Sequence, residues 1–171
     1  MPFLAIWLNN MGTMAKRRRA GIERFKRYLG KGKPGAHTYV ALLGLETLEG
    51  RDIMHVAERG IPYGTFEALR DNTDFSVEDT MRLTGIPRRT LTRRKREGRF
   101  PPDESDRLLR AARVFGRAIE LFGGDSDAAA AWLSAAQPAL GGRVPLDVAA
   151  SDLGAREVER VIGRLEHGVF S

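Results

Sequence analysis

From residue 47 to its end, the chain is interrupted by glycine and proline so often that only short helices fit between the breaks. A glycine ends a helix readily, and a proline, serine or aspartate begins one. The breaks lie at Gly60, Pro62, Gly85, Gly98, Pro101-Pro102, Gly123-Gly124 and from Pro138 to Pro145. They predict helices over 49–59, 63–71, 76–84, 88–97, 104–122, from 125 or 126 to 136, and from 151 or 152 to 167.

The segment 104–122 has the clearest buried face. Its apolar residues recur every three or four positions, which is helical spacing. They are Leu108, Ala112, Phe115, Ile119 and Phe122. No run of alternating apolar and polar residues indicates a strand, so we predict an all-α fold.

Composition narrows the class of protein. The 171 residues include no cysteine, which excludes disulfides, thiol catalysis and Cys-ligated metals. No apolar run approaches the ~20 residues of a membrane helix, and residues 1–8 make a poor signal peptide. We therefore expect a cytoplasmic protein with no membrane partner.

The net charge of +6 is concentrated in two segments. Residues 1–35 hold nine Lys or Arg against one Glu, and residues 84–99 hold seven against one. Nucleic acid is the first partner to consider for such segments, although a solvated face is the alternative. We divide the chain into a basic, flexible arm over 1–37, a helix-turn-helix domain over 38–100 and a small helical domain over 101–171.

Residues 76–97 have the proportions of a helix-turn-helix. Ser76 begins the first helix, Gly85 allows the turn, and Ile86 and Leu91 are placed to pack the two helices together. The second helix is basic, and the N-terminal side chains of a recognition helix contact base edges. We expect Arg88, Arg89, Thr90 and Arg93 to face the DNA groove, Arg94, Lys95, Arg96 and Arg99 to neutralise phosphate, Thr92 to do either, and Ser76 to add a phosphate contact.

Motifs of catalysis are missing from the sequence. The three histidines are scattered without metal-ligand spacing, and no nucleophile elbow, phosphate loop or paired-carboxylate motif occurs. We predict no enzyme activity, no metal and no cofactor.

A series of short motifs in the C-terminal third carries a family resemblance. After Thr84 to Leu91 come Pro102 to Arg110, Ala131-Trp132-Leu133, Pro138, Leu140-Gly141-Gly142, Pro145-Leu146-Asp147, Gly154 to Glu159 and Arg164 to Phe170. In this order they resemble the Xre/ParS-type antitoxins that pair with RES-domain toxins. The resemblance covers residues 38–171 and leaves the basic arm outside.

The resemblance implies a helix-turn-helix region followed by a C-terminal toxin-binding domain. In this family the partner toxins consume NAD, and the antitoxin blocks access to their active site and represses its own operon. A helix-turn-helix of this kind also implies a homodimer that joins a larger toxin–antitoxin complex. The residues that we expect to bind the toxin are Trp132, Leu133, Pro138, Leu140, Gly141, Gly142, Pro145, Arg164, Glu166, His167, Gly168, Val169, Phe170 and Ser171.

Several of these residues have a second interpretation. Trp132 is an aromatic anchor for a partner or a core residue, and Val169 and Phe170 form a docking tail or pack on their own chain. The row Arg107, Arg110, Arg113 and Arg117 is a solvated face or pairs with acidic residues of a partner or a second copy. The alternative functions are a stand-alone transcription regulator with a C-terminal dimerisation or ligand-sensing domain, and an inhibitor that binds nucleic acid without specificity.

Overall fold

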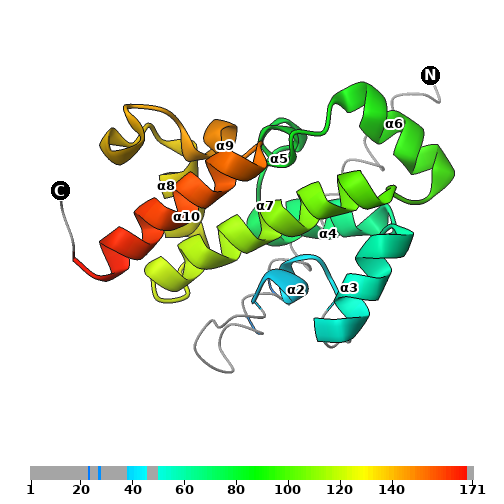
Figure 1. The fold of residues 1–171 in the computed structure, drawn as a ribbon, viewed down its shortest axis with the longest axis horizontal. Coiled ribbons are helices and arrows are strands. Elements are labelled where there is room, and N and C mark those ends of the chain that lie inside the picture. The colour runs from blue at the N-terminus through cyan, green and yellow to red at the C-terminus, as the bar shows by residue number, and fades with distance from the viewer. Residues whose placement is uncertain (1–22, 24–26, 28–37, 46–49, 169–171) are drawn as a thin grey trace, which may run out of the picture.

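A computed structural model describes residues 23, 27, 38–45 and 50–168 (Figure 1). These residues form helices with two isolated β-bridges and no strand, which confirms the all-α prediction. The elements are α2 (Thr38–Leu42), α3 (Gly50–Arg59), α4 (Gly64–Thr73), α5 (Val77–Thr84), α6 (Arg88–Glu97), α7 (Pro102–Leu121), α8 (Ser126–Ser134), the 3-10 turn η1 (Pro138–Leu140), α9 (Pro145–Val148) and α10 (Asp152–Glu166).

Helix α7 is the centre of the fold. Its predicted stripe is buried from Leu108 to Ile119, and Phe122 is partly buried at its end. Helices α2, α3, α4 and α5 pack on α7, as do α8 and α10 (Figure 1). Because α7 packs against both the N-terminal and the C-terminal helices, one continuous hydrophobic core joins the helix-turn-helix to the C-terminal helices. The domain boundary at 100/101 stays a prediction.

The helix-turn-helix forms as its sequence predicts. The backbone N–H of Asp79 donates to Ser76 Oγ at 3.0 Å, and Ser76 Oγ donates to the Asp79 carboxylate at 2.7 Å. Gly85 ends α5 with a left-handed φ of 65°. A Cβ at Gly85 would also lie 3.1 Å from the Ala150 carbonyl oxygen, so the turn lies close against the C-terminal region.

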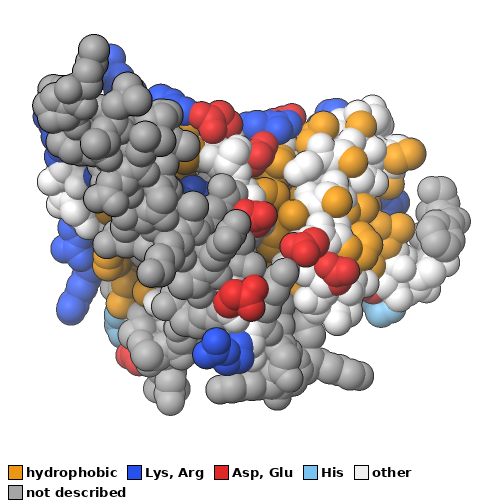
Figure 2. All heavy atoms as spheres, turned by 180° about the vertical axis from the view of Figure 1, so that it is seen from behind, with side chains coloured by type: hydrophobic (Ala, Val, Ile, Leu, Met, Phe, Trp, Pro, Cys, Tyr) orange, Lys and Arg blue, Asp and Glu red, His pale blue; other side chains and the backbone are white. Residues whose placement is uncertain are grey.

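Caps determine where the C-terminal helices begin and end. The Asp125 side chain accepts from two backbone N–H groups to begin α8, and Ser151 accepts from the Gly154 N–H to begin α10. The Gln137 side-chain amide donates to the carbonyls of Trp132 and Ala135, so α8 ends at Ser134, two residues before the predicted end. Seen from behind, the surface over the C-terminal helices shows a group of hydrophobic side chains (Figure 2).

Helices α9 and α10 meet backbone to backbone. A Cβ at Gly154 would lie 1.8 Å from the Val148 carbonyl oxygen, which no side chain can occupy. Helix α9 is only four residues long and was not expected from the sequence. The predicted basic arm over 1–37 lies outside the described residues, apart from Glu23 and Arg27, which are exposed.

Candidate functional site

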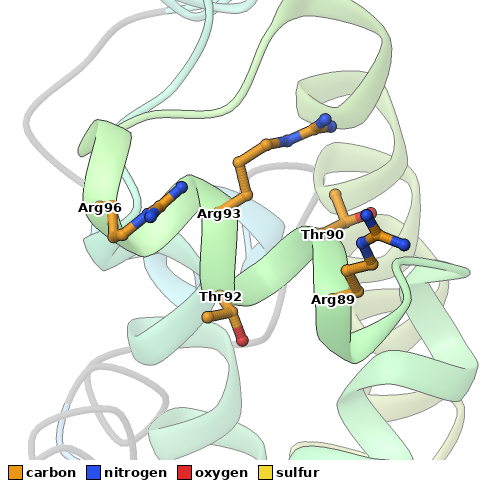
Figure 3. Close-up of a pocket in the computed structure, with 5 residues that line it drawn as sticks. All are labelled: Arg89, Thr90, Thr92, Arg93 and Arg96. Atoms are coloured by element: carbon orange, nitrogen blue, oxygen red, sulfur yellow. The ribbon is translucent and has the colours of Figure 1, made fainter.

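Helix α6 presents a basic face to solvent. Arg89, Arg93 and Arg96 are four and three positions apart, and all three are exposed. Figure 3 shows their guanidinium groups on one side of the helix, together with the Thr90 side chain. A hollow of about 450 Å³ is lined by these four residues and Thr92. This arrangement offers several hydrogen-bond donors in one direction, as contact with a groove or with phosphates requires.

The side of α6 that faces α4 carries further cations. Arg88, Thr92 and Lys95 help to line a second hollow, of about 350 Å³, which Tyr63 and Arg70 also border. Thr92 Oγ1 donates to the Arg88 carbonyl oxygen at 3.1 Å. Arg88 forms an ion pair with Glu78 of α5, and both side chains are 64% exposed. Glu78 therefore competes with any phosphate for this guanidinium.

Arg94 departs from the expectation that it neutralises phosphate. Its guanidinium points toward α7, where Nε and Nη2 donate to the two carboxylate oxygens of Glu104 at 2.7 and 2.8 Å. Only 15% of the Arg94 side chain and 9% of the Glu104 side chain are exposed. Hydrogen bonds to Glu104 and then Glu97 raise the pKa of Arg94 further above its ordinary value. Because these bonds occupy the guanidinium, Arg94 holds α6 on α7 and points away from the exposed face of α6.

Two other predicted phosphate ligands already have partners in their own chain. The Ser76 hydroxyl is occupied by the Asp79 cap. Arg99 is exposed, and its Nη2 donates to the Gly60 carbonyl oxygen at 3.1 Å. Their contact with DNA stays a prediction.

The C-terminal residues expected to bind a toxin divide into buried and exposed groups. Leu133 and Leu140 are 0% and 1% exposed, and Pro145 is buried as well. This corrects the expectation that these three side chains face a partner, because their burial leaves them no surface to offer. Trp132 is partly buried and packs against the core, and its contact with a partner stays a prediction.

The exposed group lies on the turn after α8 and at the end of α10. It comprises Pro138, Gly141, Gly142, Arg164, Glu166, His167 and Gly168. Glu166 is already bound, since Arg117 Nη2 donates to its carboxylate at 2.8 Å. The tail residues Val169, Phe170 and Ser171 lie outside the described residues.

The arginine row of α7 has a use that the sequence did not reveal. Arg107 and Arg110 donate to the carbonyls of Gly85 and Ala150 at 3.1 and 2.8 Å. Burial lowers the pKa of Arg110. Arg113 and Arg117 bind Glu159 and Glu166 of α10 at 2.6 and 2.8 Å. Each arginine thus joins α7 to another part of the chain, which differs from both a solvated face and a partner contact.

A further link joins α5 to α9. The Arg82 guanidinium donates to both Asp147 carboxylate oxygens, at 2.8 and 2.9 Å. This hydrogen bonding lowers the pKa of Asp147 and raises that of Arg82. The last turn of α5, the first helix of the helix-turn-helix, is therefore bound to α9 of the C-terminal region.

Other kinds of site find no support in the part of the chain that the structure describes. There, no group of three or more His, Asp or Glu residues could hold a metal ion. None of the described helices has both the length and the apolar character needed to cross a membrane.

Two family models match the chain, and they meet within α7. Residues 52–113 match the antitoxin Xre-like helix-turn-helix domain. Residues 117–168 match the antitoxin Xre/MbcA/ParS C-terminal toxin-binding domain. The order of the two domains is the one that the sequence motifs indicate.

Curated relatives agree with these models. A protein of Yersinia enterocolitica named Antitoxin Xre is 39% identical over 130 residues, which cover 75% of this chain and 88% of the relative. A protein of the same name from Photorhabdus laumondii is 33% identical over 130 residues, which again cover 75% of this chain and 88% of the relative. Another from Pseudomonas putida is 33% identical over 84 residues, or 48% of this chain and 52% of the relative. With two domain models in order and such identity over most of its length, the chain belongs to the Xre antitoxin family.

Proposed function

We propose that this antitoxin neutralises a RES-domain toxin and also represses its own operon by binding operator DNA. The observation that supports the DNA role is the exposed row of Arg89, Arg93 and Arg96 on a helix whose inward positions, Leu91 and Arg94, are occupied by the fold. A helix held from one side and basic on the other suits the major groove.

The toxin role is supported by the C-terminal region, which matches a toxin-binding family model up to residue 168. We expect the tail after Gly168 to enter the active site of the toxin and to exclude NAD from it. The tail follows the end of α10, where Arg164 and His167 are exposed and can bind polar groups at the entrance.

A second copy of the chain completes the DNA-binding unit. Paired helix-turn-helix readers bind half-sites about 34–36 Å apart, so we expect a homodimer on a pseudo-palindromic operator. The dimer and the toxin together form the larger complex. We expect the complex to assemble in the cytoplasm.

Growth rescue tests the toxin role. A RES-domain protein encoded beside this gene is induced together with either the full chain or a chain that lacks Gly168–Ser171, and cellular NAD is followed. The full chain should restore growth and NAD, and the shortened chain should restore much less while binding promoter DNA equally well. Rescue by both chains would refute occlusion by the tail. No rescue by a well-expressed full chain would favour a stand-alone regulator.

DNA binding is tested on the promoter fragment of the operon. The full chain should bind it at least 1,000-fold more tightly than a random duplex of the same length, as specific DNA-binding proteins do. Equal affinity for both duplexes, with a steep salt dependence, would instead indicate an inhibitor that binds nucleic acid without specificity.

A further inference from the structure

The outward side of α10 carries a row of exposed residues. These residues, which we call the outward stripe, are three or four positions apart and so share one face of the helix. They are Leu153, Arg156, Arg160, Arg164 and His167, and all are exposed. Leu153 is 78% exposed, which makes it one of two large hydrophobic side chains that the described residues leave in solvent.

The acidic residues on the other sides of α10 are bound within the molecule. Glu157 is 3.2 Å from Arg143, Glu159 is 2.6 Å from Arg113, and Glu166 is 2.8 Å from Arg117. These three pairs are formed with other elements of the fold. Because these carboxylates are bound elsewhere, they do not neutralise the arginines of α10.

The outward stripe is left with uncompensated positive charge. Arg156 is 3.0 Å from Asp152, but Arg160 and Arg164 form no ion pair within the part of the chain that the structure describes. Like charges four positions apart destabilise a helix. Arg160 and Arg164 are therefore available to a partner that brings negative charge.

We propose that the outward stripe of α10 docks an acidic surface of the toxin, beside the active site that the tail enters. This inference rests on the proposed toxin-binding function and adds to it the surface used and the charge of its partner. The stripe leads directly into the tail, because Arg164 and His167 belong to the last turn before Gly168. A toxin that receives the tail must then lie over the end of α10.

A protein surface fits the stripe better than nucleic acid does. The Asp152 carboxylate, whose side chain is 60% exposed, lies on the same helix and would repel phosphates. Leu153 adds an apolar contact, and arginine is the cation that protein interfaces favour. The stripe also lies toward the opposite end of the molecule from α6, the helix proposed to bind DNA (Figure 1).

The test measures affinity for the neighbouring RES-domain protein, using the full antitoxin chain. The double variant R160E/R164E should bind it about tenfold or more weakly, mainly through slower association, as charge reversal at an interface rim does. The matched control is K95E/R96E, which reverses two exposed cations on α6 and should leave toxin affinity unchanged. The neutral pair R160Q/R164Q should give an intermediate loss and serves if the reversal impairs folding.

The outcomes separate this inference from the function on which it rests. Unchanged toxin affinity in R160E/R164E, with wild-type binding intact, overturns the stripe and leaves the toxin role standing. A wild-type affinity that does not weaken as salt rises overturns it without any variant. Loss of duplex DNA binding alone would reassign the stripe to nucleic acid. A wild-type chain that does not bind the RES-domain protein refutes both proposals.

Discussion

Helices α6 and α7 are both rich in arginine, but only α6 has arginines without a partner in the described part of the chain. On α7, Arg107 and Arg110 bind backbone carbonyls, and Arg113 and Arg117 bind glutamates of α10. On α6, the exposed Arg89, Lys95 and Arg96 form no ion pair within the described part of the chain. All four arginines of α7 therefore hold the fold together, whereas α6 uses Arg94 for that purpose and leaves Arg89, Lys95 and Arg96 available to a partner.

The position of each helix explains the difference. Helix α7 lies at the centre, so each of its arginines meets a neighbouring turn or helix. Helix α6 lies at the edge, with Leu91 as its one buried residue. Basic residues that form no ion pair within the fold are thus better evidence for a binding surface than the number of basic residues on a helix. Within the described residues, the outer face of α6 and the outward stripe of α10 each group two or more such cations.

The largest expected effect comes from removing two exposed arginines of α6, of which Arg93 has a 4.0 Å ion pair with Glu104. The variant R89A/R93A should lose at least about 30-fold in promoter affinity, since each good base contact contributes roughly 1 kcal/mol or more. Its thermal unfolding should stay close to that of the wild type, because both side chains are exposed and Glu104, which Arg93 approaches at 4.0 Å, keeps its closer partner Arg94. Fluorescence anisotropy with the promoter fragment measures the first quantity and calorimetry the second.

The matched control for this variant is R143A. Arg143 is 57% exposed on the turn after η1, where it pairs with Glu157. Its removal should not change DNA affinity. If R143A weakens binding as much as R89A/R93A, overall charge rather than the face of α6 governs binding, and the comparison of the two helices fails.

The second prediction contrasts two arginines of α6 that lie two positions apart. R96A should weaken binding to every duplex by about threefold and reduce the salt slope by about 1, as loss of a phosphate contact does. R94A should lower the melting temperature by several degrees, because it removes both hydrogen bonds to the buried Glu104 carboxylate and leaves only Arg93, 4.0 Å away, to pair with it. Reversed results would place Arg94 in the interface and Arg96 in the fold.

Sequence reasoning predicted the helices well and the fate of single side chains less well. The breaks at Gly85, Gly98 and Gly123 depend on local backbone conformation, which a short stretch of sequence encodes. The direction of Arg94 depends on Glu104, ten positions away on another helix. The sequence had one signal for this contact, because Arg94 lies three positions after Leu91 and so shares its inward face of the helix.

The C-terminal site shows the same limit. The motifs around Leu133, Leu140 and Pro145 indicated a toxin-binding domain, and the family models agree. The burial of these three residues depends on how α8, η1 and α9 pack, which no local pattern encodes. Exposed motif residues such as Gly141 and Arg164 are the ones that remain for binding.

The third prediction concerns the one cation of the DNA-facing helix that pairs with α5. E78Q removes the carboxylate that holds Arg88, so promoter affinity should rise by about threefold, as expected for one fewer charge opposing phosphate. Affinity for a random duplex should rise at least as much, which lowers specificity. The control E58Q removes a comparably exposed charge on α3 and should change neither affinity. A fall in promoter affinity would show that Glu78 positions Arg88 for a base contact.

The smallest effect should come from the pair that joins α5 to α9. The hydrogen bonds from Arg82 hold the pKa of Asp147 below its usual value of 3.8, so the ionised carboxylate favours the folded state. Because 56% of the Asp147 side chain is exposed, solvent screens the pair, and D147N should cost only about 0.5 kcal/mol at neutral pH. The depressed pKa makes this contribution constant above about pH 5, and it should shrink as the pH falls through the folded-state pKa.

Urea unfolding of wild type and D147N between pH 8 and pH 3 would follow this difference. The two unfolding free energies should run parallel at neutral pH and converge in acid, where protonation of Asp147 removes the ion pair from the wild type as well. A difference that grows in acid would mean that the protonated carboxyl, rather than the ion pair, stabilises the link. A difference of several kcal/mol at neutral pH would mean that α5 depends on α9 as strongly as α6 depends on α7, and Arg82 would then belong with the structural arginines of α7.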